Sequence, residues 1–161
     1  MTDRLALLLP EEARARRDEL IALCAQAFAG APWHEPPRGA LRTVDRLLDS
    51  AARRPDFHAT AALGPDGELL GLAAGWTDTV LSGDAPAFEL AELVVAPAHQ
   101  GRGLGRALHD ALLVAAGPGP ALLMTLDVPE LTDRYARWGW TVVDRSRPAR
   151  EERDYAVMRR G

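Results

Sequence analysis

The chain has 161 residues and a net charge of −4; 47% of its residues are apolar, 26% charged and 6% aromatic. This balance is typical of one globular domain and excludes collagen-like, coiled-coil and disordered chains. Apolar runs are shorter than the roughly 20 residues that cross a bilayer, and Leu5–Leu9 is too short for a secretory signal core. The single cysteine, Cys24, excludes an internal disulfide and a cysteine-cluster zinc site. We expect one cytoplasmic domain over residues 1–161.

The first half of the chain predicts two helices and then antiparallel strands. Residues 10–29 carry an apolar stripe at helical spacing, on which Cys24 is expected to be a small core residue. Residues 38–53 repeat this pattern, and the loop between the two helices contains Trp33 and His34. Alternating runs over 57–63 and 69–77, joined by a Pro-Asp-Gly turn at 64–67, predict a hairpin.

The next strand, expected at 87–96, changes phase along its length. Phe88 and Leu90 are apolar at even positions, whereas Leu93 and Val95 are apolar at odd positions. One inserted residue produces such a change, so the pattern predicts a β-bulge near Ala91–Glu92.

Four further elements are expected after a glycine-rich helix start. The helix ends at Gly117–Pro120, and residues 121–126 form a fully apolar strand that is expected in the interior of the sheet. A short helix at 129–138 precedes closing strands at 140–145 and 154–159. The order indicates an α+β or mixed α/β sheet in one domain.

The segment that opens the long helix has the composition of an anion-binding turn. Glycines at 101, 103 and 105 let the backbone bend tightly and approach a ligand, and the free N–H groups of a helix start favour phosphate. Arg102 and Arg106 add positive charge. The dinucleotide fingerprint fails at Arg106, and the ATP-binding loop fails because the chain has no lysine. A nucleotide-binding module is therefore a weak alternative.

Two segments together are similar to motifs of the GCN5-related N-acetyltransferase (GNAT) superfamily. Residues 93–105, read Leu-Val-Val-Ala-Pro-Ala-His-Gln-Gly-Arg-Gly-Leu-Gly, resemble the acetyl-CoA-binding motif, and residues 135–140 resemble the Tyr-x-x-x-Gly-aromatic segment. Val128 and Leu131 depart from the Asn and Ala often found in members. The resemblance implies a central, mostly antiparallel, twisted sheet of six to seven strands flanked by about four helices, bulged and splayed at the fourth strand.

The resemblance also implies the acyl donor and its ligands. Acetyl-CoA would be bound as a co-substrate, with no metal. Its pantetheine arm would lie against the bulged strand and its diphosphate against the glycine turn. The implied residues are Leu93, Val94, Val95, Gln100, Gly101, Arg102, Gly103, Leu104, Gly105 and Arg106.

Transfer to an amine needs a group that accepts a proton, because an alkyl amine of pKa about 10 is mostly protonated at neutral pH. By resemblance this group is a glutamate 11 residues before Gln100, which is Glu89; Glu92, nearer the thioester, is the rival. Tyr135 matches the tyrosine that protonates the leaving thiolate. For each of the three, a plain structural role is the alternative.

The acceptor is expected to be a small-molecule or peptide amine, and a cationic one. No basic residue stands between Arg54 and Arg102, a span with seven acidic residues. Such a span repels nucleic acid and attracts cations, unless its acids are simply solvated. Trp33, Asp78, Asp84 and Glu92 are the expected acceptor-side residues. His34 could join Trp33 there, whereas His99 and His109 are isolated, and His109 is expected at the surface.

The leading hypothesis is an acetyl-CoA-dependent N-acetyltransferase that works by direct attack in a ternary complex. The alternative is a catalytically silent acyl-CoA-binding regulatory domain. Neither nucleic acid nor a membrane is an expected partner. A homodimer is compatible with the sequence, which leaves the number of subunits and the identity of the acceptor open.

Overall fold

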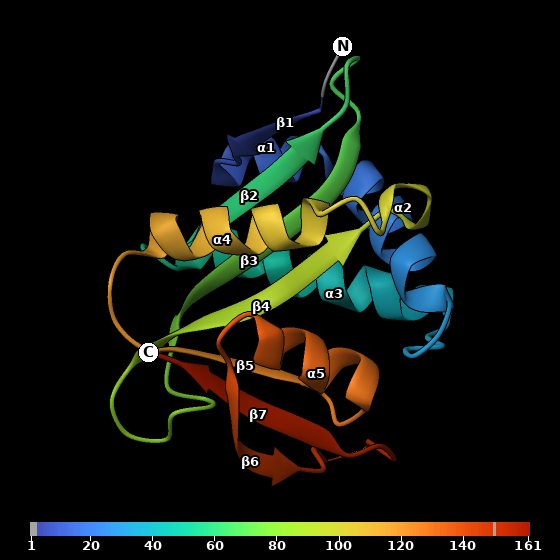
Figure 1. Cartoon of the computed structure of the whole chain (residues 1–161). Coiled ribbons are helices and arrows are strands. Elements are labelled where there is room, and N and C mark those ends of the chain that lie inside the picture. Colours follow the sequence, from blue (N-terminus) through green and yellow to red (C-terminus); the bar gives the residue numbers. More distant parts are fainter. Residues whose placement is uncertain (1–2, 150) are drawn as a thin grey trace.

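The computed structural model describes residues 3–149 and 151–161 and contains one sheet of seven strands (Figure 1). The order across the sheet is β1-β2-β3-β4-β5-β7-β6. Among these strands, every neighbouring pair is antiparallel except the parallel pair β4 and β5. The strands are β1 (Arg4–Leu7), β2 (His58–Leu63), β3 (Leu69–Asp78), β4 (Ala87–Val95), β5 (Ala121–Leu126), β6 (Thr141–Ser146) and β7 (Tyr155–Arg160).

Helices cover both faces of this sheet. In Figure 1, α4 crosses one face of β2, β3 and β4, and α3 lies on the opposite face. In the described residues the α-helices are α1 (Pro10–Ala15), α2 (Arg17–Ala29), α3 (Pro37–Arg53), α4 (Leu104–Ala116) and α5 (Pro129–Arg137), with a 3-10 turn at Pro97–His99. None of the helices is long and apolar enough to cross a membrane in the part of the chain that is described.

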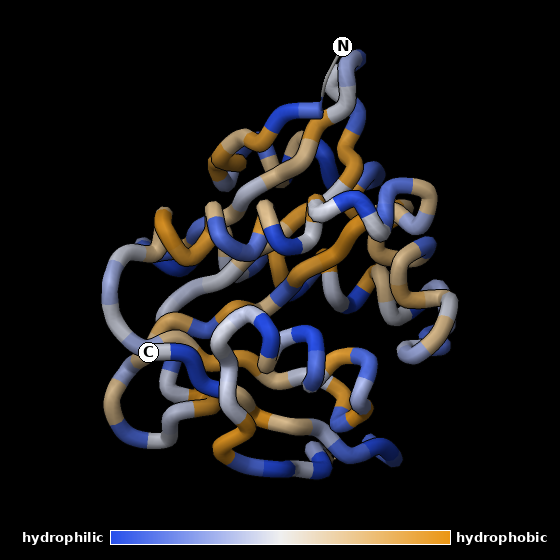
Figure 2. The backbone as a smooth tube through the Cα atoms, viewed as in Figure 1, coloured by the Kyte–Doolittle hydropathy of each residue, from blue (hydrophilic) through white to orange (hydrophobic). Residues whose placement is uncertain are grey.

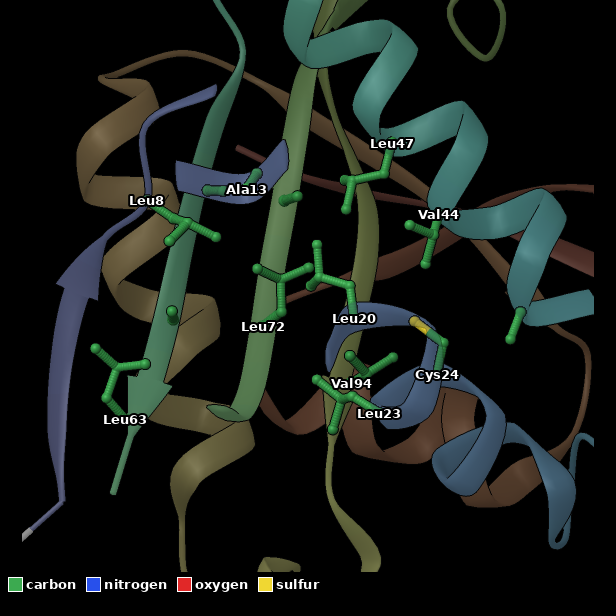
Figure 3. Packing of buried hydrophobic residues seen from close by; sticks show 14 of the residues in the cluster. Leu8, Ala13, Leu20, Leu23, Cys24, Val44, Leu47, Leu63, Leu72 and Val94 are labelled. Carbon is green, nitrogen blue, oxygen red and sulfur yellow. The ribbon is translucent and has the colours of Figure 1, made fainter. Parts of the chain in front are cut away.

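Two apolar clusters hold these layers together. One joins α1, α2 and α3 to the sheet, and Figure 3 shows Leu20 of α2 beside Leu72 of β3 and Leu23 of α2 beside Val94 of β4. The other lies under α4 and includes Leu108 and Leu112. Apolar and polar positions alternate along α4 in Figure 2, as expected for a helix with one buried stripe. Cys24 is buried in the first cluster, which confirms that it is a core residue.

The N-terminal region differs from the prediction in two ways. The apolar run Leu5–Leu9 contributes an edge strand, β1, that pairs with β2. The single helix expected at 10–29 is broken at Arg16, whose side chain donates a hydrogen bond to the carbonyl oxygen of Gly67 at 3.0 Å. The apolar stripe on which the single helix was predicted begins at Leu20, after the break, so the pattern did not test whether residues 10–16 continue the same helix.

The bulge expected in β4 is confirmed. Ala74 of β3 pairs with Glu92 and the next residue, Gly75, pairs with Leu90, so Ala91 is the extra residue. As a result Phe88, Leu90, Leu93 and Val95 all pack on the α4 side. Without the insertion, the last two side chains would point to the opposite face.

Strands β4 and β5 also separate, as a splay at the fourth strand requires. They pair only at Phe88–Ala121 and Glu89–Leu122 in the described structure, although β5 pairs with β7 along all six residues. Beyond Glu89 the edge of β4 that faces β5 is therefore not covered by a neighbouring strand.

Gly75 permits the close approach of β3 at the bulge. A Cβ atom there would lie 2.4 Å from the carbonyl oxygen of Glu89 and 2.6 Å from Phe88 Cζ. We predict that Gly75→Ala lowers the free energy of unfolding by about 1–3 kcal/mol, since a packed site must move to admit the methyl group. Urea unfolding measures it. Gly30→Ala, where a Cβ meets nothing within 4 Å, is the control with little change expected; equal losses in both variants would contradict the prediction.

Candidate functional site

The glycine turn lies directly before α4 and has the backbone that its sequence predicts. Gly101 and Gly103 have φ values of +76° and +85°, a region that L-residues with a side chain rarely adopt. Gly103 is the N-cap of α4, so the first N–H groups of the helix have no carbonyl partner within it. Gln100 Nε2 donates to the carbonyl oxygen of Val95 at 3.0 Å and fastens the turn to the end of β4.

A cavity of about 370 Å³, here called the glycine cavity, opens in front of this turn. It is lined by the turn, by the end of β4, by α5 and by the segment after α2. Nine of the ten residues expected to bind the acyl donor line it; the tenth, Arg102, is held by Asp3 at 3.0 Å and by His99. The nine are Leu93, Val94, Val95, Gln100, Gly101, Gly103, Leu104, Gly105 and Arg106.

A second cavity of similar volume, the glutamate cavity, lies at the gap between β4 and β5. Residues 90–93 of β4 and 123–125 of β5 line it, together with residues of α3 and with Pro148, Glu151 and Tyr155. Its carboxylates are Glu35, Glu92 and Glu151. The two cavities share four lining residues, which are Phe28, Trp33, Leu93 and Tyr135.

Tyr135 stands where the two cavities meet. It comes from α5, packs edge-on against the rings of Trp138 and Trp140, and lines both cavities. Burial raises the pKa of its hydroxyl to about 12, so the group stays protonated at physiological pH. Its neighbour Leu131, one of the two departures from the family pattern, is buried and lines the glycine cavity.

The structure separates the two candidate bases. Glu92 lines the glutamate cavity, its side chain is 11% exposed, and Arg46 of α3 donates to it at 2.7 Å. Burial raises its pKa to about 6, although Arg46 opposes the shift. Glu89 accepts a hydrogen bond from the Leu81 amide at 3.0 Å, and burial raises its pKa against this bond. Glu89 is not among the residues that line either cavity.

The other expected acceptor-side acids lie elsewhere. Asp78 pairs with Arg54 at 2.8 Å at the far end of β3, and Asp84 is exposed on the loop before β4. Of the four acceptor-side residues, the structure brings Trp33 and Glu92 together in the glutamate cavity.

Sequence reasoning missed residues from the segment before β7. Glu151 and Tyr155 line the glutamate cavity, and the Tyr155 hydroxyl donates to Glu151 at 3.1 Å. Arg153 donates to the Trp33 carbonyl oxygen at 2.6 Å and lies 3.8 Å from Glu35. This segment is thereby joined to the loop after α2, 120 residues earlier. No local pattern signals such a contact.

His109 is a correction. It was expected at the surface, yet it is fully buried on the inner face of α4. It accepts a hydrogen bond from Trp140 Nε1 at 2.9 Å, and its other nitrogen contacts Asp110 at 2.8 Å. The expectation failed because the partner that makes burial tolerable lies 31 residues away. His34 is exposed beside Trp33, and the described residues contain no cluster of three or more metal-ligating side chains.

Comparison with protein families identifies the class of protein. The model of the acetyltransferase (GNAT) family matches residues 19–128, and the chain therefore belongs to this family. No curated protein sequence matches the chain.

Solved structures share its fold at low sequence identity. A GNAT-family acetyltransferase of Bordetella pertussis, described as putative, is 22% identical, with 100% of this chain and 98% of that one covered at a TM-score of 0.72. A Pyrococcus horikoshii protein is 17% identical over 99% and 98%, with a TM-score of 0.75. The PaiA N-acetyltransferase of Thermoplasma acidophilum, solved with coenzyme A, is 16% identical over 99% of both chains, with a TM-score of 0.67.

At Gly105 the fold itself can accept a side chain, so a substitution there tests whether a ligand needs the space. A Cβ there would lie 3.7 Å from Val95 and 3.9 Å from Trp138, which are ordinary contacts, and the residue is helical. We predict that Gly105→Val folds but loses at least tenfold in acetyl-CoA affinity, since its side chain fills space in the glycine cavity that a diphosphate would use. Titration calorimetry gives the affinity. Ala116→Val, at the other end of α4, controls for a β-branched residue in this helix, and unchanged binding by Gly105→Val would contradict the prediction.

Proposed function

We propose that the protein transfers the acetyl group of acetyl-CoA to the primary amine of a small molecule or peptide by direct attack in a ternary complex. The observation that carries this proposal is the meeting of two cavities at Tyr135, one of them at the end of β4 and the other at the gap between β4 and β5. One has the features of an anion cradle, and the other has a buried carboxylate of raised pKa. The coenzyme A complex of the Thermoplasma acidophilum protein, which shares the fold, is consistent with a donor in the first cavity.

The donor's chemistry fits the residues of the glycine cavity. The N–H groups at the start of α4 and the guanidinium of Arg106 suit a diphosphate. The edge of β4 beyond Glu89 offers main-chain groups to the amides of a pantetheine arm, as the family resemblance implies. Acetyl-CoA supplies the activated carbonyl group, and the protein's residues orient it and move protons.

Glu92 is the base that we propose, in place of Glu89. It lines the cavity in which the amine would lie, and its pKa of about 6 leaves it mostly ionised at neutral pH. Glu89 lines neither cavity. Glu92 would take one proton from the ammonium group, so that the nitrogen lone pair can attack the carbonyl carbon.

Tyr135 is the proposed donor to the sulfur. Its hydroxyl is protonated at physiological pH, and the residue lines both cavities. It would donate its proton to the sulfur as the carbon–sulfur bond breaks and recover one from the nitrogen. The sum is an ammonium and a thioester converted to an amide, a thiol and one released proton.

A panel of amines tests this function. Purified protein with acetyl-CoA should release free thiol in the presence of at least one of several polyamines, aminoglycosides, amino acids and peptide N-termini. Binding of acetyl-CoA without release of free thiol for any amine would favour the catalytically silent acyl-CoA-binding domain.

The single-domain organisation and the cytoplasmic location stay predictions from the sequence.

The pH dependence distinguishes the two glutamates. With a base of pKa about 6 acting on the bound ammonium, log kcat/KM should rise up to about pH 6 and then level off. In Glu92→Gln only free amine reacts, so the rate should be lower and rise continuously toward the amine pKa near 10. The loss is therefore largest at low pH. Glu89→Gln is the matched variant and should keep the plateau; the reverse assignment follows if Glu89→Gln loses it instead.

A further inference from the structure

A chain of hydrogen bonds runs from the core to the edge of the glycine cavity. Trp140 Nε1 donates to His109 Nε2 at 2.9 Å, and His109 Nδ1 lies 2.8 Å from Asp110 Oδ1. Arg106 Nε donates to both carboxylate oxygens of Asp110, at 3.0 and 3.1 Å. Because an indole nitrogen can only donate, His109 accepts at Nε2 and donates from Nδ1. These four residues form one hydrogen-bonded network.

The inner end of this hydrogen-bond network, at Trp140 and His109, is buried, and its outer end, at Asp110 and Arg106, lies at the surface. Trp140 is 2% exposed and His109 is fully buried, whereas the side chains of Arg106 and Asp110 are each 48% exposed. Burial, aided by Arg160 of β7 and Arg106, lowers the pKa of His109, so it is neutral at physiological pH. Burial acts to raise the pKa of Asp110, but its bonds from His109 and Arg106 outweigh this and lower it.

In the described part of the chain, the hydrogen bonds of Arg106 leave its two terminal nitrogens free to donate to a ligand. Asp110 occupies only Nε, and the guanidinium carbon lies 5.6 Å from the ring of Trp138, which lines the same cavity. Within the described residues, neither terminal nitrogen makes a hydrogen bond. A guanidinium fixed in this manner presents two parallel N–H groups, the geometry that suits phosphate.

We propose that Asp110, backed by His109, is a positioning residue for the diphosphate of the acyl donor, through Arg106. The inference deepens the proposed function, since it rests on a coenzyme A donor in the glycine cavity. A carboxylate beside an anion site weakens anion binding unless it orients a cation. The competing explanation, a surface i,i+4 ion pair that only adds slightly to the stability of α4, assigns it no such role.

The two explanations predict opposite signs for Asp110→Asn. If Asp110 only adds negative charge near the cavity, its neutralisation should tighten coenzyme A binding. If it positions Arg106, the dissociation constant should rise on the order of tenfold, in the range seen for residues that orient direct ligands. Titration calorimetry with coenzyme A on the purified chain measures it without any turnover. Asp49→Asn, which breaks the i,i+4 pair with Arg53 on α3, is the control and should leave the constant unchanged.

Two further measurements localise the effect. S-acetyl-pantetheine lacks the diphosphate, so its kcat/KM should be the same in wild type and Asp110→Asn. Trp140→Phe removes the donor to His109 at the inner end and should raise the coenzyme A constant in the same direction, by less.

The outcomes separate this inference from the proposed function. A constant for Asp110→Asn at or below the wild-type value overturns the inference. Coenzyme A binding without thiol release by any amine overturns the proposed function and leaves the comparison of constants intact. Wild-type protein that fails to bind coenzyme A contradicts both.

Discussion

Strands β4 and β5 pair at two positions and then part; the glutamate cavity lies at the gap that results, and the glycine cavity lies against the end of β4. Main-chain N–H and C=O groups at such a gap need partners, because leaving them buried and unpaired costs free energy comparable to a lost hydrogen bond. If apolar side chains filled the gap, the main-chain groups of residues 90–95 that face β5 would be buried without hydrogen-bond partners. An opening that water or a polar ligand can enter avoids it. The fold therefore sets where an extended, amide-bearing ligand can lie before any side chain is considered.

The bulge at Ala91 has a second consequence, for the two glutamates. Positions 89 and 92 differ by three, so in a regular strand their side chains would point to opposite faces. The extra residue returns them to one face, as the packing of Phe88, Leu90 and Leu93 on the other face requires. Both then feel the positive charge of Arg46 on α3. They differ in what holds them, a main-chain amide for Glu89 and a guanidinium for Glu92.

Much of this arrangement could be predicted from local sequence. The phase change in residues 88–95 located the bulge, because the period of a strand is fixed by the pleat. The glycines at 101 and 103 predicted a tight turn, and both have positive φ; the apolar run 121–126 predicted an interior strand, and β5 does lie inside the sheet. Each of these signals depends only on neighbours within about ten residues.

The parts that could not be predicted depend on partners distant in the chain. The buried His109 accepts a hydrogen bond from Trp140, and Arg153 ties the stretch that contains Glu151 to the carbonyl oxygen of Trp33. The edge strand β1 is four residues long and owes its existence to pairing with β2. A single sequence contains the residues of these contacts but no periodicity that joins them.

The acidic span between Arg54 and Arg102 illustrates how charge along a sequence differs from charge in space. Asp56 accepts from the Thr77 amide, Asp78 pairs with Arg54, and Glu89 accepts from the Leu81 amide, so these acids fasten strand ends and loops. The carboxylates of the glutamate cavity come instead from three separate segments, and each lies within 4 Å of an arginine. A cavity whose carboxylates are paired in this way exerts little net field on a ligand. Discrimination among amines would then depend on the aromatic walls and on the distance to Glu92 more than on steering by net charge.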